Sequence, residues 1–125
     1  MIYTESNEYK VKFYTDPKTN KSRVFEYIDD LDTPQKAKIS NRIEFLRQHK
    51  GVLDEPYSKH IKGKIRELRI DFGKNKHRIF YFTFVKKNII LLHAFLKRTQ
   101  KTPETEIKIA ENNYYNVINN PKIYE

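Results

Sequence analysis

The sequence predicts an α+β fold built as a single domain over residues 1–125, with an antiparallel sheet and the element order β-α-α-β-β-β-α. Three observations support this prediction. A chain of 125 residues has the length of one ordinary domain with one hydrophobic core. Apolar residues alternate with period two near the N-terminus and between residues 65 and 97, and they take helical spacing in the segments between and after these. A hydrophobic fraction of 38% with 14% aromatic residues is typical of a chain that folds.

The N-terminal part begins with a strand over residues 9–14, where apolar and polar positions alternate. Residues 16–20, Asp-Pro-Lys-Thr-Asn, have the composition of a turn. Ser22 is then placed to cap a short helix whose apolar side chains share one face. That face consists of Val24, Tyr27 or Ile28, and Leu31.

A second helix follows directly, so that the two form a helical hairpin. Asp32 or Thr33 caps it, Pro34 lies in its first turn, and Gly51 is placed to end it. Its apolar face consists of Ile39, Ile43 and Leu46. Residues 52–63 have no regular pattern, and we therefore expect them to form a surface loop that leads into the sheet.

The second half of the chain predicts an antiparallel meander of three strands joined by tight turns. The strands cover residues 65–72, 77–85 and 89–97, and the turns cover residues 73–76 and 86–88. Strict alternation in the last strand gives two apolar faces, one with Ile89, Leu91 and Phe95 and one with Ile90, Leu92 and Leu96. A strand that is apolar on both faces should lie centrally or be covered on both sides.

A third helix is predicted near the C-terminus. Thr102 caps it, Pro103 starts it, and Glu104 and Glu106 lie near the positive end of its dipole. Its buried stripe consists of Ile107, Ala110, Tyr114 and Val117 or Ile118.

Positive charge is concentrated in the middle of the chain. Residues 1–35 carry five Lys/Arg against seven Asp/Glu, residues 36–101 carry eighteen against five, and residues 102–125 carry two against four. The net charge of +9 therefore arises entirely from the central segment. Such a field attracts polyanions, which makes nucleic acid, an anionic membrane or an acidic protein the candidate partners. The competing interpretation is that the lysines serve only solubility.

Several classes of site are excluded or disfavoured by composition. The chain has no cysteine, which excludes a disulfide, a thiolate zinc site and a cysteine nucleophile. It has no signal-peptide core and no apolar window of bilayer length, so we expect a soluble, cytoplasmic protein without membrane contact. Glu67 and Asp71 share a strand face, but this basic region supplies too few carboxylates for a two-metal nuclease, and no metal is expected.

Three motifs in the central segment carry a resemblance to a known family. They are Glu67-Leu68-Arg69, then Arg78-Ile79-Phe80-Tyr81-Phe82, and then the junction that runs from Leu91 through Lys97-Arg98-Thr99-Gln100-Lys101 to Pro103. In these motifs the chain resembles the RelE/ParE toxin superfamily and, within it, the phage-derived HigB-like branch. The junction is the most specific of the three, and the N-terminal elements agree with the family by order only.

The resemblance implies a RelE-like fold and the toxin of a type II toxin–antitoxin system. Such a toxin is a metal-independent endoribonuclease (mRNA interferase) that cleaves mRNA, commonly on the translating ribosome, needs no cofactor and inhibits growth. Its implied partners are mRNA, the ribosome and a cognate antitoxin, of HigA-like type with a helix-turn-helix domain. The alternative is a binding protein of the same fold, either a ParE-like gyrase inhibitor or a phage protein that sequesters RNA.

Metal-free RNA cleavage needs fixed positive charge for the pentavalent phosphorane and groups that move protons. We expect Arg69, Arg78 and Arg98 to stabilise the phosphorane, because guanidinium forks on strands are rigid phosphate ligands. The candidates for proton transfer are His93, Lys97 and Lys101. Several family members place a catalytic tyrosine or histidine just beyond the junction, where this chain has residues 102–105, Thr-Pro-Glu-Thr, and so the general base stays open.

Each assignment has a structural alternative. His93 lies between apolar neighbours and could be a core residue, Arg69 could pair with Glu67 or Asp71, and Tyr81 could pack in the core instead of stacking on a base. The cations of the junction, Lys97, Arg98 and Lys101, repel one another unless an anion gathers them. The residues expected to hold RNA backbone are Lys59, Lys62, Lys64 and Arg66.

Overall fold

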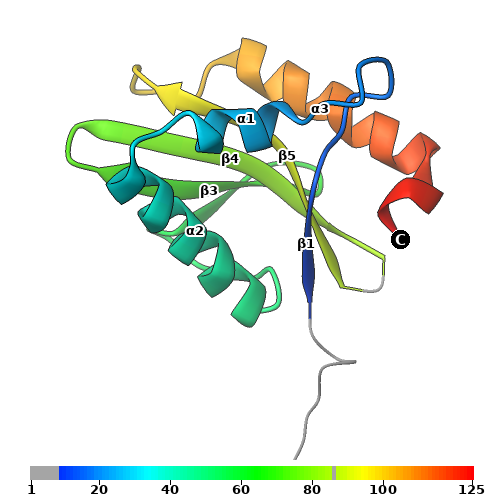
Figure 1. Cartoon of the computed structure of the whole chain (residues 1–125), viewed down its shortest axis with the longest axis horizontal. Helices are drawn as coiled ribbons and strands as arrows, with labels where there is room; N and C mark the ends of the chain where they lie inside the picture. The colour runs from blue at the N-terminus through cyan, green and yellow to red at the C-terminus, as the bar shows by residue number, and fades with distance from the viewer. Residues whose placement is uncertain (1–8, 86) are drawn as a thin grey trace, which may run out of the picture.

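The computed structural model describes residues 9–85 and 87–125, which form an α+β arrangement around a five-stranded sheet (Figure 1). The strands are β1 (Lys10–Phe13), β2 (Ser58–Lys62), β3 (Ile65–Phe72), β4 (Asn75–Phe84) and β5 (Asn88–Lys97). Their order across the sheet is β1-β5-β4-β3-β2. The helices are α1 (Arg23–Asp29), α2 (Thr33–Gln48) and α3 (Glu104–Asn119), followed by the 3₁₀ turn η2 (Pro121–Tyr124).

The helices cover opposite faces of the sheet and create two apolar clusters. On one face, Val24 and Ile28 of α1 and Ile39 and Leu46 of α2 pack against the sheet. On the other face, α3 supplies Ala110 and Val117. Burial on both faces is what the apolar pattern of the last strand predicted, and β5 lies inside the sheet between β1 and β4.

The prediction of an antiparallel sheet is wrong in one pairing. β1 runs parallel to β5, with Val11 opposite Ile89 and Phe13 opposite Leu91, so the sheet is mixed. Residue alternation reports which face of a strand is buried, but it contains no information on the direction of the neighbouring strand.

The prediction of a loop over residues 52–63 is also wrong, because its second half forms β2. This strand pairs with β3 only, at the edge of the sheet. Its fully buried residue is Ser58, whose hydroxyl lies 2.7 Å from that of Tyr81, and its one apolar residue is Ile61, so apolar residues do not alternate along it. A polar edge strand of this kind escapes detection by hydrophobic periodicity.

The predicted facing of the side chains is wrong in the C-terminal half of β5, because the strand contains an irregularity. Phe80 lies opposite His93 and Tyr81 lies opposite Leu91, so Leu92 has no partner in the register with β4. Beyond this β-bulge the facing is inverted. Phe95 packs in the α3-side cluster with Ile90 and Leu92, and not with Ile89 and Leu91 as strict alternation predicts.

The predicted helix starts are confirmed for the hairpin and wrong for the third helix. The Ser22 hydroxyl accepts a hydrogen bond from the Phe25 amide, and the Asp32 carboxylate accepts one from the Gln35 amide. Thr102 does not cap α3, whose N-cap is Pro103 without a side-chain hydrogen bond. Its hydroxyl instead donates to Glu67 at 3.0 Å, because a buried carboxylate lies within its reach.

The end of α2 generates a stability prediction. Gly51 has φ +78°, its amide donates to the Leu46 carbonyl, and an added Cβ would lie 2.6 Å from Thr83 Oγ1. Gly51→Ala should therefore lower the free energy of unfolding by roughly 2–4 kcal/mol, from backbone strain and the clash together.

The matched control is Gly73→Ala. Gly73 has φ +58° but no atom within 4 Å of an added Cβ, so only the backbone term of about 1 kcal/mol applies. Chemical denaturation of both variants measures the difference, and equal losses would contradict the contact between Gly51 and Thr83.

Candidate functional site

The α3-side face of the sheet has a cationic surface made from three neighbouring strands. In register, Arg69 of β3 lies opposite Arg78 of β4, and Lys76 of β4 lies opposite Lys97 of β5. These residues share a face with Phe80 and Phe95, which belong to the apolar cluster under α3. We refer to Arg69, Lys76, Arg78 and Lys97 as the strand cations.

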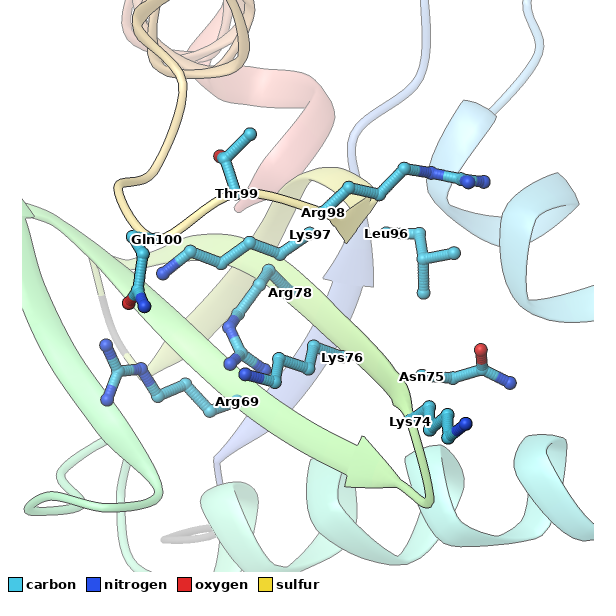
Figure 2. Close-up of a pocket in the computed structure, with 10 residues that line it drawn as sticks. All are labelled: Arg69, Lys74, Asn75, Lys76, Arg78, Leu96, Lys97, Arg98, Thr99 and Gln100. Carbon is cyan, nitrogen blue, oxygen red and sulfur yellow. The ribbon is translucent and has the colours of Figure 1, made fainter.

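The strand cations line an open cavity of about 630 Å³ (Figure 2). The other lining residues are Lys74, Asn75, Leu96, Arg98, Thr99 and Gln100. Six of these ten described residues are Lys or Arg and none is acidic. A concave surface with this lining attracts anions.

Arg78 is the most deeply placed of the strand cations, with 5% of its surface exposed. Its Nη1 donates to Asp71 Oδ1 at 2.7 Å and to the His77 carbonyl at 3.0 Å. Burial by itself raises the pKa of Asp71, but the hydrogen bond and charge of Arg78 bring that pKa below its usual range. The buried Nε of Arg78 has no hydrogen-bond partner among the described residues, so one N–H donor of the guanidinium is unsatisfied.

Glu67 lies completely buried beneath the strand cations. Its Oε1 accepts from Arg69 Nε at 3.2 Å, and its Oε2 accepts from Thr102 Oγ1 at 3.0 Å. The contact with Glu67 is one of the two ion pairs that the structural alternative for Arg69 predicted, and Arg69 also lies 3.9 Å from Glu55, which was not predicted. One carboxylate thus orients Arg69 and ties β3 to the junction before α3.

Lys97 has the electrostatic surroundings of a proton-transfer group. Burial lowers the pKa of its ammonium, and the charges of Arg78, Arg69 and Lys59 lower it further, whereas the charge of Glu67 opposes the shift. Its side chain points across the cavity toward Gln100 (Figure 2). A lowered pKa makes the Lys97 ammonium a stronger acid than that of an exposed lysine.

The other predicted catalytic residues lie apart from this group. Arg98 lines the cavity rim, but its side chain points away from Arg78 and toward α1 (Figure 2). Its charge acts on Tyr27 of α1, whose pKa burial raises to about 12 against the opposing effect of Arg98. Lys101 is exposed in the loop before α3 and is not among the lining residues.

His93 is also not among the lining residues. Its Nε2 lies 2.6 Å from Glu106 Oε1, and its ring packs beside those of Phe80 and Phe95. This contact joins β5 to the first turn of α3, which agrees with the structural alternative for His93.

The four residues expected to hold RNA backbone are separated by the fold. Lys59 lies opposite Glu67 in register and therefore beside the strand cations. Lys62 pairs with Glu111 of α3 at 3.0 Å, and Lys64 is exposed in the turn between β2 and β3. Arg66 donates to the Ser58 hydroxyl and the Leu53 carbonyl, which are structural contacts.

Sequence reasoning missed Glu67 as part of the site, and it missed Lys76, Thr99 and Gln100 in the lining. The alternation that places Glu67 and Arg69 on one face was the available signal for the first. Lys76 lies opposite Asp71 across the tight turn between β3 and β4, so hairpin register was the signal for the second. Thr99 and Gln100 lie within the junction motif, which was the signal for these two loop residues. Tyr81 is fully buried, so its ring belongs to the core.

Two kinds of site are not found in the part of the chain that the structure describes. No group of three or more His, Asp or Glu side chains there is arranged to hold a metal ion. Across residues 9–85 and 87–125, no helix combines the length and apolar character needed to cross a bilayer.

A comparison with protein-family models finds a match over most of the chain. The family model described as phage derived protein Gp49-like (DUF891) matches residues 26–115, which is well over half of the chain and contains every strand cation. No curated protein matches significantly.

The crowding of the strand cations generates a second prediction. Because burial and neighbouring cations disfavour the charged form of Lys97, Lys97→Met should leave the free energy of unfolding unchanged or raise it by up to about 1 kcal/mol at pH 7. Since the pKa in the folded protein lies below 10.5, the wild type should gain stability relative to this variant as pH rises from that pKa toward 10.5.

Urea denaturation at pH 7 and pH 10 measures both effects. Lys108→Met, which removes an exposed lysine of α3, is the control for losing a positive charge elsewhere. A loss of more than about 1 kcal/mol in Lys97→Met alone would show that the ammonium is held by a favourable contact.

Proposed function

This chain belongs to the phage-derived Gp49-like family, a RelE/HigB-type toxin family, and we propose that it is an endoribonuclease toxin that cleaves mRNA without a metal ion. The observation that carries the proposal is the convergence of Arg69, Arg78 and Lys97, from three adjacent strands, on one cavity. A dianionic phosphorane needs fixed positive charge of this kind, held by rigid elements.

In the proposed reaction the 2′-hydroxyl of one nucleotide attacks the adjacent phosphorus. Arg69 and Arg78 donate hydrogen bonds to the equatorial oxygens of the phosphorane and stabilise the charge that develops there. The bond from phosphorus to the 5′-oxygen breaks, leaving a 2′,3′-cyclic phosphate and a 5′-hydroxyl. No water, metal ion or cofactor takes part in this step.

Lys97 is the proposed acid that protonates the departing 5′-oxygen. Its ammonium reaches into the cavity, and its pKa is lowered by burial and by the neighbouring arginines. His93 and Lys101 are the candidates for the base that takes the 2′-hydroxyl proton, and either would have to approach the cavity when RNA binds. Arg98 contributes charge at the rim of the cavity, and Lys59, opposite Glu67 in register, contributes charge beside the strand cations.

The proposal extends to the RelE-like fold and to the partners that such a toxin has. A cognate antitoxin of HigA-like type would neutralise the cationic surface, and cleavage would take place in the cytoplasm on mRNA held by the ribosome. The excess of Lys and Arg between residues 36 and 101 fits contact with ribosomal and messenger RNA backbone.

A second function is favoured by the ion pairs within the site. Arg69 pairs with Glu67 and Arg78 pairs with Asp71, so part of the charge is neutralised within the protein. A toxin that acts by contact alone, as a ParE-like gyrase inhibitor or an RNA-sequestering protein, needs no freely available guanidinium. The two functions differ in whether RNA is cut.

The chemistry of the RNA ends tests the main proposal. We expect toxin-dependent fragments from translated mRNA to carry a 5′-hydroxyl, which polynucleotide kinase labels without prior phosphatase treatment, and a 2′,3′-cyclic or 3′-phosphate. Any cleavage of ribosome-free RNA should continue in EDTA. Intact mRNA in growth-arrested cells, together with inhibited gyrase, would establish the alternative.

Conservative variants test the residues. Arg78→Lys keeps the charge but removes the guanidinium fork, and Lys97→Met removes the proposed acid with little change in volume; each should lower the cleavage rate at least about 10²-fold. Lys108→Met is the control. Rates within about threefold of wild type in both site variants, with unchanged circular dichroism, would overturn the assignment.

A further inference from the structure

The edge of β3 beyond the end of β2 is closed by side chains of α2. β2 pairs with β3 as far as Ser58 and Leu68, and the Arg69 amide then bonds to the Tyr57 carbonyl. Past this point, Arg42 donates to the Arg69 carbonyl and Lys38 donates to the Asp71 carbonyl. Two cations of α2 thus lie along the same edge as Arg69, one of the strand cations.

Arg42 and Tyr57 form a cation–π pair at this edge. The guanidinium carbon of Arg42 lies 4.8 Å from the centroid of the Tyr57 ring. Phe45 packs against the Tyr57 ring in a T-shaped arrangement, with centroids 5.5 Å apart and planes at 73°. The guanidinium is held by the Arg69 carbonyl, so both planar groups are fixed in place. Tyr57 nevertheless keeps 40% of its surface exposed, unlike the buried Tyr81.

A small cavity of about 160 Å³ lies against this pair and adjoins the main cavity. Its lining residues are Lys38, Arg42, Pro56, Tyr57, Arg69 and Asp71. Arg69 lines both cavities, so a chain whose phosphate contacts Arg69 can continue from one into the other. The carboxylates nearby are engaged, since Asp71 pairs with Arg78 and Glu55 lies 3.9 Å from Arg69.

We propose that Tyr57 and Arg42 form a stacking site for one unpaired nucleobase next to the phosphate held by the strand cations. The inference rests on the proposed function for the identity of the strand as RNA. Single-stranded RNA binds through phosphate contacts to cations and through bases stacked on aromatic rings or guanidinium planes. This edge offers both groups beside Arg69.

An acidic peptide is the other polyanion that could bind here, but the arrangement favours RNA. A peptide carboxylate is recognised by the edge of a guanidinium and gains nothing from an aromatic ring, whereas Arg42 donates from its edge to the Arg69 carbonyl and lies over the ring of Tyr57. A base needs a flat surface and no free donor. The site should therefore be sensitive to planarity and tolerant of which base is bound.

The test measures binding without cleavage. A short RNA with 2′-O-methyl groups at every ribose cannot be cut, and 2-aminopurine or an abasic residue is moved along it one position at a time. In the wild type, we expect one position where the fluorescence of 2-aminopurine is quenched and where removing the base weakens binding on the order of tenfold. In Tyr57→Leu the abasic effect at that position should disappear.

Three variants sharpen the result. Tyr57→Phe keeps the ring and should retain the base dependence, whereas Arg42→Lys keeps the charge, loses the planar group and should weaken it. Phe25→Leu removes an exposed aromatic ring of α1, remote from the cavity, as the control. Denaturation curves confirm that each variant is folded.

The outcomes separate this inference from the cleavage proposal. An abasic effect of equal size in wild type and Tyr57→Leu overturns the stacking site, even if the protein cuts RNA. A base dependence that Tyr57→Leu abolishes supports the site, even if no cleavage is found. Wild-type protein that does not bind the oligonucleotide at all, at low salt, overturns it as well.

Discussion

The main constraint on this structure is that the sheet brings several positive side chains close together. Arg69, Arg78 and Lys97 lie on one face of three adjacent strands, where each repels the others. Two carboxylates offset part of the repulsion: Glu67 lies beneath Arg69, and Asp71 pairs with Arg78. The apolar clusters on both faces of the sheet stabilise the fold against the remaining repulsion, and an anion in the cavity would reduce that repulsion.

The central strand β4 holds the cluster in place because both of its faces are anchored. Arg78 points toward the cavity, while its neighbour His77 is buried on the opposite face. The His77 ring bonds through Nδ1 to the Tyr27 hydroxyl at 2.7 Å and through Nε2 to Gln35 Oε1 at 2.6 Å. Burial lowers the pKa of His77, as does the charge of Arg78, and the ring joins α1, α2 and β4 through its two hydrogen bonds.

The structure supports Lys97 over His93 as the candidate for proton transfer. His93 is one of the candidates for proton transfer that the sequence indicates, but its ring is hydrogen-bonded to Glu106 and packs beside Phe80 and Phe95. Lys97 lies in the cavity with a lowered pKa and a cationic setting. Thr102, at the position expected to cap a helix, bonds instead to the carboxylate that orients Arg69. The hydroxyl of Thr102 thereby links the junction to the carboxylate beneath the strand cations.

Period and capping are local properties of the chain, and they were enough to predict the helical hairpin with its caps, the meander, the two-sided burial of β5 and the side of β3 on which Arg69 lies. The parallel pairing of β1, the edge strand β2 and the bulge at Leu92 depend instead on contacts between distant segments. That bulge has the largest consequence for the site. It inverts the facing of β5 after Leu92 and brings Lys97 to the face that holds Arg78, a placement that depends on register between distant segments and that no alternation within one strand encodes.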